Sequence, residues 1–415
     1  MKKYIILVFG CQMNQSDSER IIRVLNNMGL EETSNIKLAD LAVMVACSVR
    51  QSAIDRVYGQ SYNWQARRTK GKLFAILTGC VMPKDKEKLQ SRFDLVLDVK
   101  DIGRLPQKLG GLRIIDRDYF HINPKHQSNW QAQVPIMTGC NNFCSYCVVP
   151  YVRGREVSRS VEKVIAECKQ LISSGYKEIT LLGQNVNSYK SGKYDFTKLL
   201  YAIDKIAGDY WLRFVTSHPK DLSGELIKVM AKGKHITPYL HLPIQSGDNQ
   251  ILKLMNRKYT VSHYLKLVEK VRRVVPNIML STDIIVGFPS ETKEQFKNSV
   301  RLMKKVKFDM AFISQYSTRL GTVAAKLADN VSKSEKTRRE KELIKVLKQT
   351  AKANNKMLIG HEVEVLVDSC KNDQCVGKTK TFKVVKFKGR KKIVGNFVKV
   401  RVNKVQNWWL VGEVI

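Results

Sequence analysis

A strand-then-helix unit is repeated six times between residues 131 and 330, and this repetition constrains the fold more than any other feature. Each unit begins with a short apolar segment and continues into a stretch with apolar residues at helical spacing. Six such units without an obvious seventh or eighth predict an incomplete barrel, a partial (β/α)6 fold. The expected strands are 134–138, 178–182, 212–216, 239–243, 279–285 and 309–315, and two of the expected helices are 161–171 and 264–274.

Unusual residues follow the predicted strands directly. In barrels of parallel strands the chemistry lies at the carboxyl ends of the strands. The polar side chains expected at this end include Gln184, Asn185, Ser217 and Gln245, together with His218 and His241. A histidine in such a place is as often structural as catalytic, so the two histidines carry less weight.

Three cysteines follow the first of these strands. Cys140, Cys144 and Cys147 supply three thiolates within eight residues, and no fourth ligand lies nearby. Three thiolates can hold three irons of a cubane iron–sulfur cluster and leave the fourth iron open to a substrate. Structural zinc usually has four protein ligands in two spaced pairs, so zinc is the weaker interpretation.

Residues 1–130 alternate apolar strands with amphipathic helices, which predicts a parallel sheet covered on both faces. Cys11, Cys47 and Cys80 each follow one of the predicted strands, and ligand sites in open α/β sheets lie at the carboxyl ends of strands. A second cluster of three thiolates is therefore favoured over three unrelated small core residues. The expected strands are 4–9, 41–45, 73–77 and 93–99, and a helix is expected to begin at Ser16.

Residues 356–415 are predicted to form a small β-barrel, entered through a charged helix that starts at Ser332. Lysines and arginines lie among Phe382, Phe387 and Phe397, so the barrel is expected to bind RNA through phosphates and stacked bases. A solubilising β-domain with aromatic residues in its core is the alternative. The expected strands are 361–367, 381–388, 396–402 and 408–414.

The charge balance supports a polyanionic partner. The chain has 72 Lys and Arg against 37 Asp and Glu, a formal net charge of +35, and the excess is spread over all three parts. Phosphate neutralisation drives nucleic-acid affinity, although a generally basic proteome would give the same bias. No apolar run is long enough to span a bilayer and no signal peptide is recognisable, so a cytoplasmic protein without membrane contact is expected. Nine cysteines in a reducing cytosol are expected to serve metals or catalysis rather than disulfides.

Over nearly its whole length the chain resembles the radical S-adenosylmethionine (SAM) methylthiotransferases. The segment GCNNFCSYCVVPYVRGRE at 139–156 resembles the cluster motif of that family. The resemblance implies a methylthiotransferase domain at 1–130, a radical-SAM barrel at 131–355 and an OB-like TRAM domain at 356–415. It implies two [4Fe-4S] clusters, one on Cys140, Cys144 and Cys147 and an auxiliary one on Cys11, Cys47 and Cys80. Gln184, Asn185, Ser217 and Gln245 become candidate contacts for SAM.

Two segments resemble the branch that modifies N6-isopentenyladenosine next to the anticodon of tRNA, at position 37: 182–189 and 241–247. The alternatives are methylthiolation of threonylcarbamoyladenosine in tRNA, methylthiolation of ribosomal protein S12, and a non-catalytic iron–sulfur RNA-binding module. In the implied mechanism one cluster cleaves SAM to a 5′-deoxyadenosyl radical, and the auxiliary cluster holds the sulfur that a second SAM methylates. The expected partners are the anticodon stem-loop, a sulfur donor and a reductant such as a flavodoxin or ferredoxin, and the protein is expected to be a monomer.

The chain departs from the family pattern in two places. Val45 and Ala46 stand where Asn-Thr usually precedes the second auxiliary cysteine, which removes polar groups from that cluster's surroundings. The segment 317–322 lacks the prolines often found around its arginine. Of the remaining residues, Arg153 and Arg155 are candidates for contacts with RNA phosphates or SAM, or for a solvated loop. Cys168 is expected in the core, and no metal is expected at Cys370 and Cys375.

Overall fold

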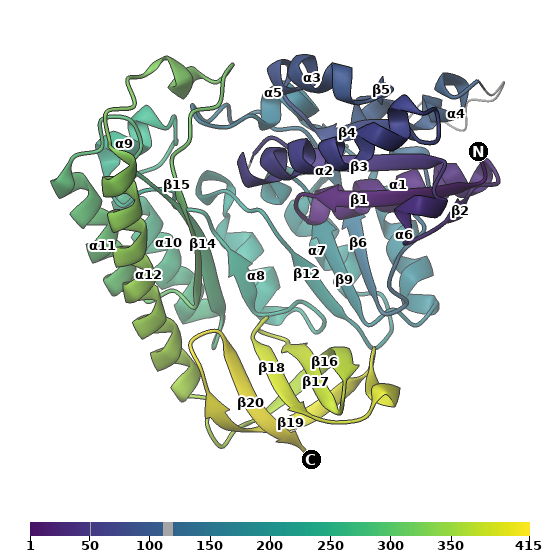
Figure 1. Ribbon diagram of the computed structural model, residues 1–415. Coiled ribbons are helices and arrows are strands. Elements are labelled where there is room, and N and C mark those ends of the chain that lie inside the picture. Colours follow the sequence, from purple (N-terminus) through teal and green to yellow (C-terminus); the bar gives the residue numbers. More distant parts are fainter. Residues whose placement is uncertain (50, 111–118) are drawn as a thin grey trace.

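The computed structural model describes residues 1–49, 51–110 and 119–415. Three parts follow one another along the chain, and Figure 1 shows the first at the top, the second in the middle and the third at the bottom. No helix within the described residues is both long and apolar enough to cross a membrane.

The first part is a five-stranded parallel sheet in the order β2-β1-β3-β4-β5. Alternate residues of β3 face opposite sides: Leu41, Val43 and Val45 pack with α1, whereas Ala42 and Met44 pack with α2. The sheet is therefore covered on both faces, as predicted. Its elements are β1 (Lys3–Phe9), α1 (Gln12–Asn27), β2 (Glu31–Glu32), β3 (Leu41–Cys47), α2 (Gln51–Thr69), β4 (Phe74–Cys80), α3 (Pro83–Leu89), β5 (Leu95–Val96) and α4 (Leu105–Lys108).

Two expectations for this part need correction. Helix α1 begins at Gln12 rather than at Ser16, because Cys11 takes the N-cap position and the Cys11 backbone N–H donates to Asn14 Oδ1 (3.3 Å). The fourth predicted strand shrinks to the two residues of β5, and the short edge strand β2 was not predicted.

The second part holds six parallel strands in chain order, as the sequence predicted. They form two three-stranded sheets, β12-β9-β6 and β13-β14-β15, and a single bridge between Leu212 and Ile236 continues the first sheet toward the second. The strands are β6 (Gln131–Pro135), β9 (Glu178–Leu182), β12 (Trp211–Phe214), β13 (Tyr239–His241), β14 (Met279–Val286) and β15 (Met310–Gln315). The short strands are β7 (Met137–Thr138), β8 (Val157–Ser158), β10 (Lys190–Ser191) and β11 (Tyr194–Asp195).

Amphipathic helices cover the outside of these strands and share one apolar core with them. Cys168 of α6 is fully buried in that core, as expected. The long helix α12 begins after the N-cap Ser332 and packs against β15 and α11. The helices are α5 (Val149–Arg153), α6 (Val161–Ser173), α7 (Phe196–Asp204), α8 (Gly224–Lys232), α9 (Asn249–Leu254), α10 (Val261–Val274), α11 (Lys293–Val306) and α12 (Lys333–Lys356).

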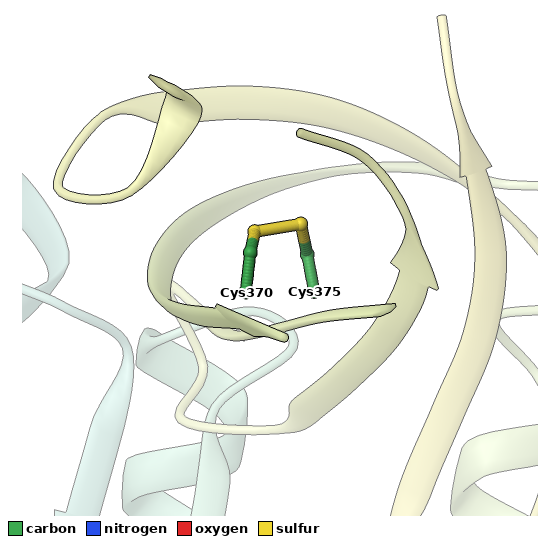
Figure 2. The surroundings of a disulfide bond; sticks show 2 residues. All are labelled: Cys370 and Cys375. Atoms are coloured by element: carbon green, nitrogen blue, oxygen red, sulfur yellow. A yellow bond between two sulfur atoms is a disulfide. The ribbon is translucent and has the colours of Figure 1, made fainter. Parts of the chain in front are cut away.

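The third part is a closed five-stranded barrel in the order β16-β17-β18-β20-β19. The four predicted strands are present, and the fifth, β17, was missed. The expectation that cysteines avoid disulfides is wrong here, because Cys370 of β16 and Cys375 of β17 are directly paired residues of a hairpin and are joined by a disulfide (Figure 2). The strands are β16 (Glu362–Lys371), β17 (Gln374–Thr379), β18 (Val384–Lys388), β19 (Phe397–Val405) and β20 (Trp409–Val414).

The expected role of the barrel's aromatic residues also changes. Phe387 lies in the core of the barrel, Phe382 stacks on Tyr239, and the Phe397 ring lies against Trp211. Phe387 is buried and the other two rings are half-buried, and all three pack within the barrel or against the second part. The exposed cationic side chains of the barrel strands and the loops between them are Lys371, Lys386, Lys388, Arg390, Lys391, Lys392, Lys399, Arg401 and Lys404.

Candidate active site

One cavity of about 310 Å3 is lined by all six predicted cluster cysteines. It lies between the first and second parts, where the carboxyl ends of β1, β3 and β4 face the carboxyl ends of the barrel strands. The two cysteine triads therefore share one cavity, although more than fifty residues separate Cys80 from Cys140 in the sequence. Sequence spacing alone could not show this convergence.

The first triad is built by neighbouring strands. Cys47 and Cys80 are paired residues at the ends of β3 and β4, and Cys11 follows β1, which is the other neighbour of β3. Gly79 makes the close approach possible: its φ is +106°, and a Cβ there would lie 2.3 Å from the Ala46 carbonyl oxygen. The Asn14 amide lies near Ala46 O (3.5 Å) and Cys80 Sγ (3.8 Å), so α1 supplies a polar group beside a strand that lacks Asn-Thr.

The second triad lies on the loop between β7 and α5. Gly139 has a φ of +79°, and a Cβ on it would lie 2.0 Å from the Arg155 carbonyl oxygen, so the loop can fold back on itself only with glycine there. The Cys147 backbone N–H donates to Cys144 O (2.9 Å), and the Asn256 amide donates to Phe143 O (2.9 Å). The three sulfurs are thus presented by a tightly held loop.

The thiols differ in how readily they ionise. Burial raises the pKa of Cys147 to about 12 and also raises the pKa values of Cys140 and Cys11. The pKa of Cys80 is lowered, mainly because the Cys47 thiol donates to it and further because of Arg153. Buried thiolates need a compensating cation, which an iron–sulfur cluster supplies.

No three His, Cys, Asp or Glu side chains of the described ranges surround a single-ion site. In a cubane each thiolate binds a different iron.

Two arginines reach the cysteines. The Arg153 Nε–H donates to Cys80 Sγ (2.9 Å), and the Arg257 Nη1–H donates to Cys144 Sγ (3.3 Å). The alternative that Arg153 lies in a solvated loop is therefore wrong, since its side chain is 2% exposed and paired with Asp17. Arg153 also lines the cavity, so its contact with SAM or RNA stays a prediction. Arg155 is exposed, and its guanidinium lies over the Phe143 ring. Sequence reasoning missed Arg257 because the loop that carries it has no distinguishing pattern.

Three of the four predicted SAM contacts line the cavity: Gln184, Ser217 and Gln245. Gln184 Oε1 and Ser217 Oγ are buried and have no hydrogen-bond partner among the described residues. Buried polar atoms are normally paired, so these two atoms fit a polar ligand such as SAM in the cavity. Asn185 is not among the lining residues, and its Nδ2–H donates to Asp221 (2.8 Å).

The two strand-end histidines differ. His218 lines the cavity, its Nδ1 accepts from the Lys220 backbone N–H (3.2 Å), and burial lowers its pKa to about 2, so the ring is neutral. His241 does not line this cavity and contacts Asp283 (3.3 Å) and Ser281 (2.9 Å). Asp283, which sequence reasoning also missed, lines the cavity from β14.

Comparison with known proteins matches each part of the chain to a family. Residues 3–99 match Uncharacterized protein family UPF0004, residues 134–303 match the Radical SAM superfamily, and residues 343–415 match the TRAM domain. Among solved structures, the radical S-adenosylmethionine methyltransferase TsrM from Kitasatospora setae covers 78% of this chain and 77% of its own, with a TM-score of 0.57 and 14% identity. At that identity the likeness concerns the fold alone.

Similarity to two relatives extends over the full length. The tRNA-2-methylthio-N(6)-dimethylallyladenosine synthase of Clostridium novyi (strain NT) is 41% identical, over 100% of this chain and 97% of that protein. The protein of the same name from Caldicellulosiruptor saccharolyticus is 42% identical, over 100% of this chain and 93% of that protein. The chain therefore belongs to the tRNA-2-methylthio-N(6)-dimethylallyladenosine synthase family of the radical SAM superfamily.

Proposed function

We propose that this protein inserts a methylthio group at C2 of N6-isopentenyladenosine, also called N6-dimethylallyladenosine, at position 37 of tRNA. The observation that carries this proposal is the convergence of two cysteine triads on one cavity. Full-length relatives that bear the synthase name support the same reaction.

The residues present fit the cofactors that this reaction needs. Cys140, Cys144 and Cys147 would hold the [4Fe-4S] cluster that the radical SAM superfamily implies. The triad of Cys11, Cys47 and Cys80 would hold the second cluster and keep the sulfur close to the first. Together with SAM, the clusters supply the radical chemistry and the sulfur needed at C2 of adenine, a barely acidic carbon that acid–base catalysis cannot activate.

The side chains of the cavity bind and orient. Gln184 Oε1 and Ser217 Oγ are acceptors for donor groups of SAM, and Gln245 faces the same space from the opposite sheet. The backbone at Thr216 and Gln245 has φ values of 71° and 73°, a conformation that non-glycine residues rarely adopt and that is concentrated at functional sites. Neutral His218 does not add charge beside SAM.

A groove on the surface gives the RNA a path to the cavity. A groove of about 640 Å3 runs along β15 between Trp408 of the TRAM barrel and Arg319, and Phe312 projects into it. A neighbouring pocket of about 220 Å3 contains both Phe312 and Cys147, so the groove continues to the second triad. Phe312 is 48% exposed and offers a stacking face to an unpaired base, while the exposed lysines of the TRAM barrel attract the phosphates.

The partners follow from the reaction. Reductive cleavage of SAM requires a low-potential electron donor such as a flavodoxin or ferredoxin, and each turnover consumes a sulfur atom that a donor must replace. We further propose that the protein acts as a monomer, with the anticodon stem-loop bound across the TRAM barrel and β15.

Mass spectrometry of tRNA nucleosides tests the function. Reconstituted protein is incubated without oxygen with SAM, a reductant and tRNA that carries N6-isopentenyladenosine. The expected product is 2-methylthio-N6-isopentenyladenosine, and the matched Cys140→Ala variant should form none of it. If 5′-deoxyadenosine appears without this product, and tRNA with threonylcarbamoyladenosine or ribosomal protein S12 is methylthiolated instead, the proposed substrate is refuted.

A further inference from the structure

Each cysteine triad has a buried arginine against one of its sulfurs, but the positive charges of the two arginines are compensated differently. Arg257 donates to Cys144, and its other two hydrogen bonds go to neutral oxygens, Pro243 O (2.9 Å) and Tyr259 Oη (2.7 Å). Arg153 donates to Cys80 and forms an ion pair with the carboxylate of Asp17 (2.6 Å). Only the charge of Arg153 is therefore compensated by a carboxylate in these contacts.

The ion pair of Arg153 and Asp17 is deeply buried and held from several sides. The side chain of Asp17 is 0% exposed and that of Arg153 is 2% exposed. The Tyr119 hydroxyl donates to Asp17 Oδ1 (2.6 Å), and the Asn14 amide donates to Asp17 Oδ2 (3.3 Å). With its acceptor atoms engaged in this way, Asp17 aims the guanidinium at Cys80.

The pair also connects the two halves of the site. Asp17 lies on α1, which starts directly after Cys11, and Arg153 is the last residue of α5, which starts two residues after Cys147 of the second triad. A movement of either triad relative to the other would break contacts that are charge-assisted and shielded from water.

Hydrogen bonds and charges near cluster sulfurs set the reduction potential of an iron–sulfur cluster. A donor or a positive charge at a thiolate stabilises the reduced, more negative state and raises the potential. A nearby carboxylate acts in the opposite direction. Arg153 and Asp17 should therefore have opposite effects on a cluster bound through Cys80.

We propose that Arg153 and Asp17 form a positioning pair that sets the reduction potential of the auxiliary cluster, Arg153 raising it through Cys80 and Asp17 lowering it. The proposal rests on the second cluster of the proposed function. In this proposal the pair acts through the Cys80 sulfur, so its effect is measurable on the cluster itself.

The test isolates the auxiliary cluster. In the parent protein Cys140, Cys144 and Cys147 are all replaced by alanine, which leaves one triad. After anaerobic reconstitution this parent should hold about four irons, and its potential is measured by redox titration followed by electron paramagnetic resonance. If the parent holds no cluster while the wild type holds one, the second cluster is refuted, which is distinguishable from a failure of the present proposal.

Two substitutions in this parent decide the proposal. Arg153→Gln should shift the potential to more negative values, and Asp17→Asn should shift it to more positive values. We expect the ratio of oxidised to reduced cluster at a fixed applied potential to change by about tenfold in each case, which equals about 59 mV for a one-electron couple. Arg153→Lys keeps the charge, so it should shift the potential less than Arg153→Gln.

A remote ion pair provides the matched control. Arg339 and Glu291 form another buried ion pair (2.7 Å, 3% and 1% exposed) that belongs to α12 and the loop before α11. Arg339→Gln removes a buried charge from the protein in the same way and should leave the potential unchanged. Shifts of Arg153→Gln and Asp17→Asn in the same direction would indicate a merely structural role and overturn the proposal, as would unchanged potentials in both variants.

Discussion

Arg213 connects the TRAM barrel to the radical-SAM barrel through hydrogen bonds. We expect its substitution to weaken the attachment of the TRAM barrel. The side chain is 1% exposed, its Nε–H donates to Glu178 Oε2 (2.5 Å), and its Nη groups donate to Lys380 O and Thr379 O, both at 2.8 Å. The guanidinium also lies near the rings of Trp211 (5.1 Å) and Phe382 (4.8 Å). A single side chain thus bonds to one strand of the second part and two carbonyls of the third.

The size of the destabilisation follows from the groups that lose their hydrogen-bond partner in Arg213→Met. Glu178 is 5% exposed, and a carboxylate buried without its partner costs about 3–5 kcal/mol. The two carbonyls lose their donors as well, although water can reach them once the barrel separates. The double variant Arg213→Met/Glu178→Leu buries no unpaired charge and should recover a substantial part of the loss.

Urea unfolding and hydrogen exchange measure the effect. We expect Arg213→Met to lower the free energy of unfolding by about 3–5 kcal/mol and to expose the amides of residues 379–383 to exchange. The matched control is Arg401→Met, which breaks an ion pair with Glu362 on the surface of the same barrel (3.0 Å, 50% and 47% exposed) and should cost at most about 1 kcal/mol. Equal losses in the two variants would refute the account of Arg213.

Three further outcomes are expected. Gly139→Ala should prevent iron binding at the second triad, as counted by iron analysis, because its Cβ would meet the Arg155 carbonyl. Gly154→Ala, at φ +80° and ψ −166° but with open space around it, should cost about 1–3 kcal/mol of folding stability and keep the iron. Burial lowers the pKa of His218 from 6.5 to about 2 on folding, so below pH 6.5 the unfolded state binds a proton that the folded state does not, and folding stability falls. Between pH 7.5 and 5.5 the apoprotein should lose about 1.4 kcal/mol more than His218→Gln in urea unfolding, and equal losses would contradict the lowered pKa. Phe312→Ala should weaken anticodon stem-loop binding about tenfold in fluorescence anisotropy while SAM cleavage continues, whereas Tyr201→Ala, exposed on α7, should bind normally.

Fold elements with a strong apolar pattern could be predicted from the sequence. For the strand at 178–182 the sequence predicts both the first and the last residue correctly, because all five of its side chains are buried in one uninterrupted segment. Strand β17 was missed because it contains Gln374, Lys378 and Gly377, and its position is set by pairing with β16. At Gly377 a Cβ would lie 2.3 Å from the Leu366 carbonyl oxygen, a constraint that only the folded barrel reveals.

The disulfide had a signal in the sequence that was not used. Asn372 and Asp373 have φ values of 48° and 56°, the conformation of a two-residue hairpin turn that Asn and Asp favour. In such a hairpin the residues two positions before and after the turn pair directly, which places Cys370 opposite Cys375. The prediction that the cysteines form no disulfide rested instead on the reducing cytosol expected for this protein.

The candidate site was predictable where it depends on strand ends. All six cysteines, with Gln184, Ser217 and Gln245, line the cavity because parallel strands bring their carboxyl ends together. The hydrogen bonds of long side chains could not be predicted. Arg153 and Arg257 donate to cysteine sulfurs that are 73 and 113 residues away in the chain. Such contacts depend on how separate sheets are placed relative to one another, and no local pattern encodes that placement.

The central claim is that two cysteine triads hold two clusters at one cavity, and iron analysis with Mössbauer spectroscopy of three proteins tests it most directly. The wild type should contain about eight irons in [4Fe-4S] clusters. The variant with Cys11, Cys47 and Cys80 replaced by alanine and the variant with Cys140, Cys144 and Cys147 replaced by alanine should each contain about four. A wild type with about four irons, together with one triad variant whose iron content and spectrum are unchanged, would contradict the claim.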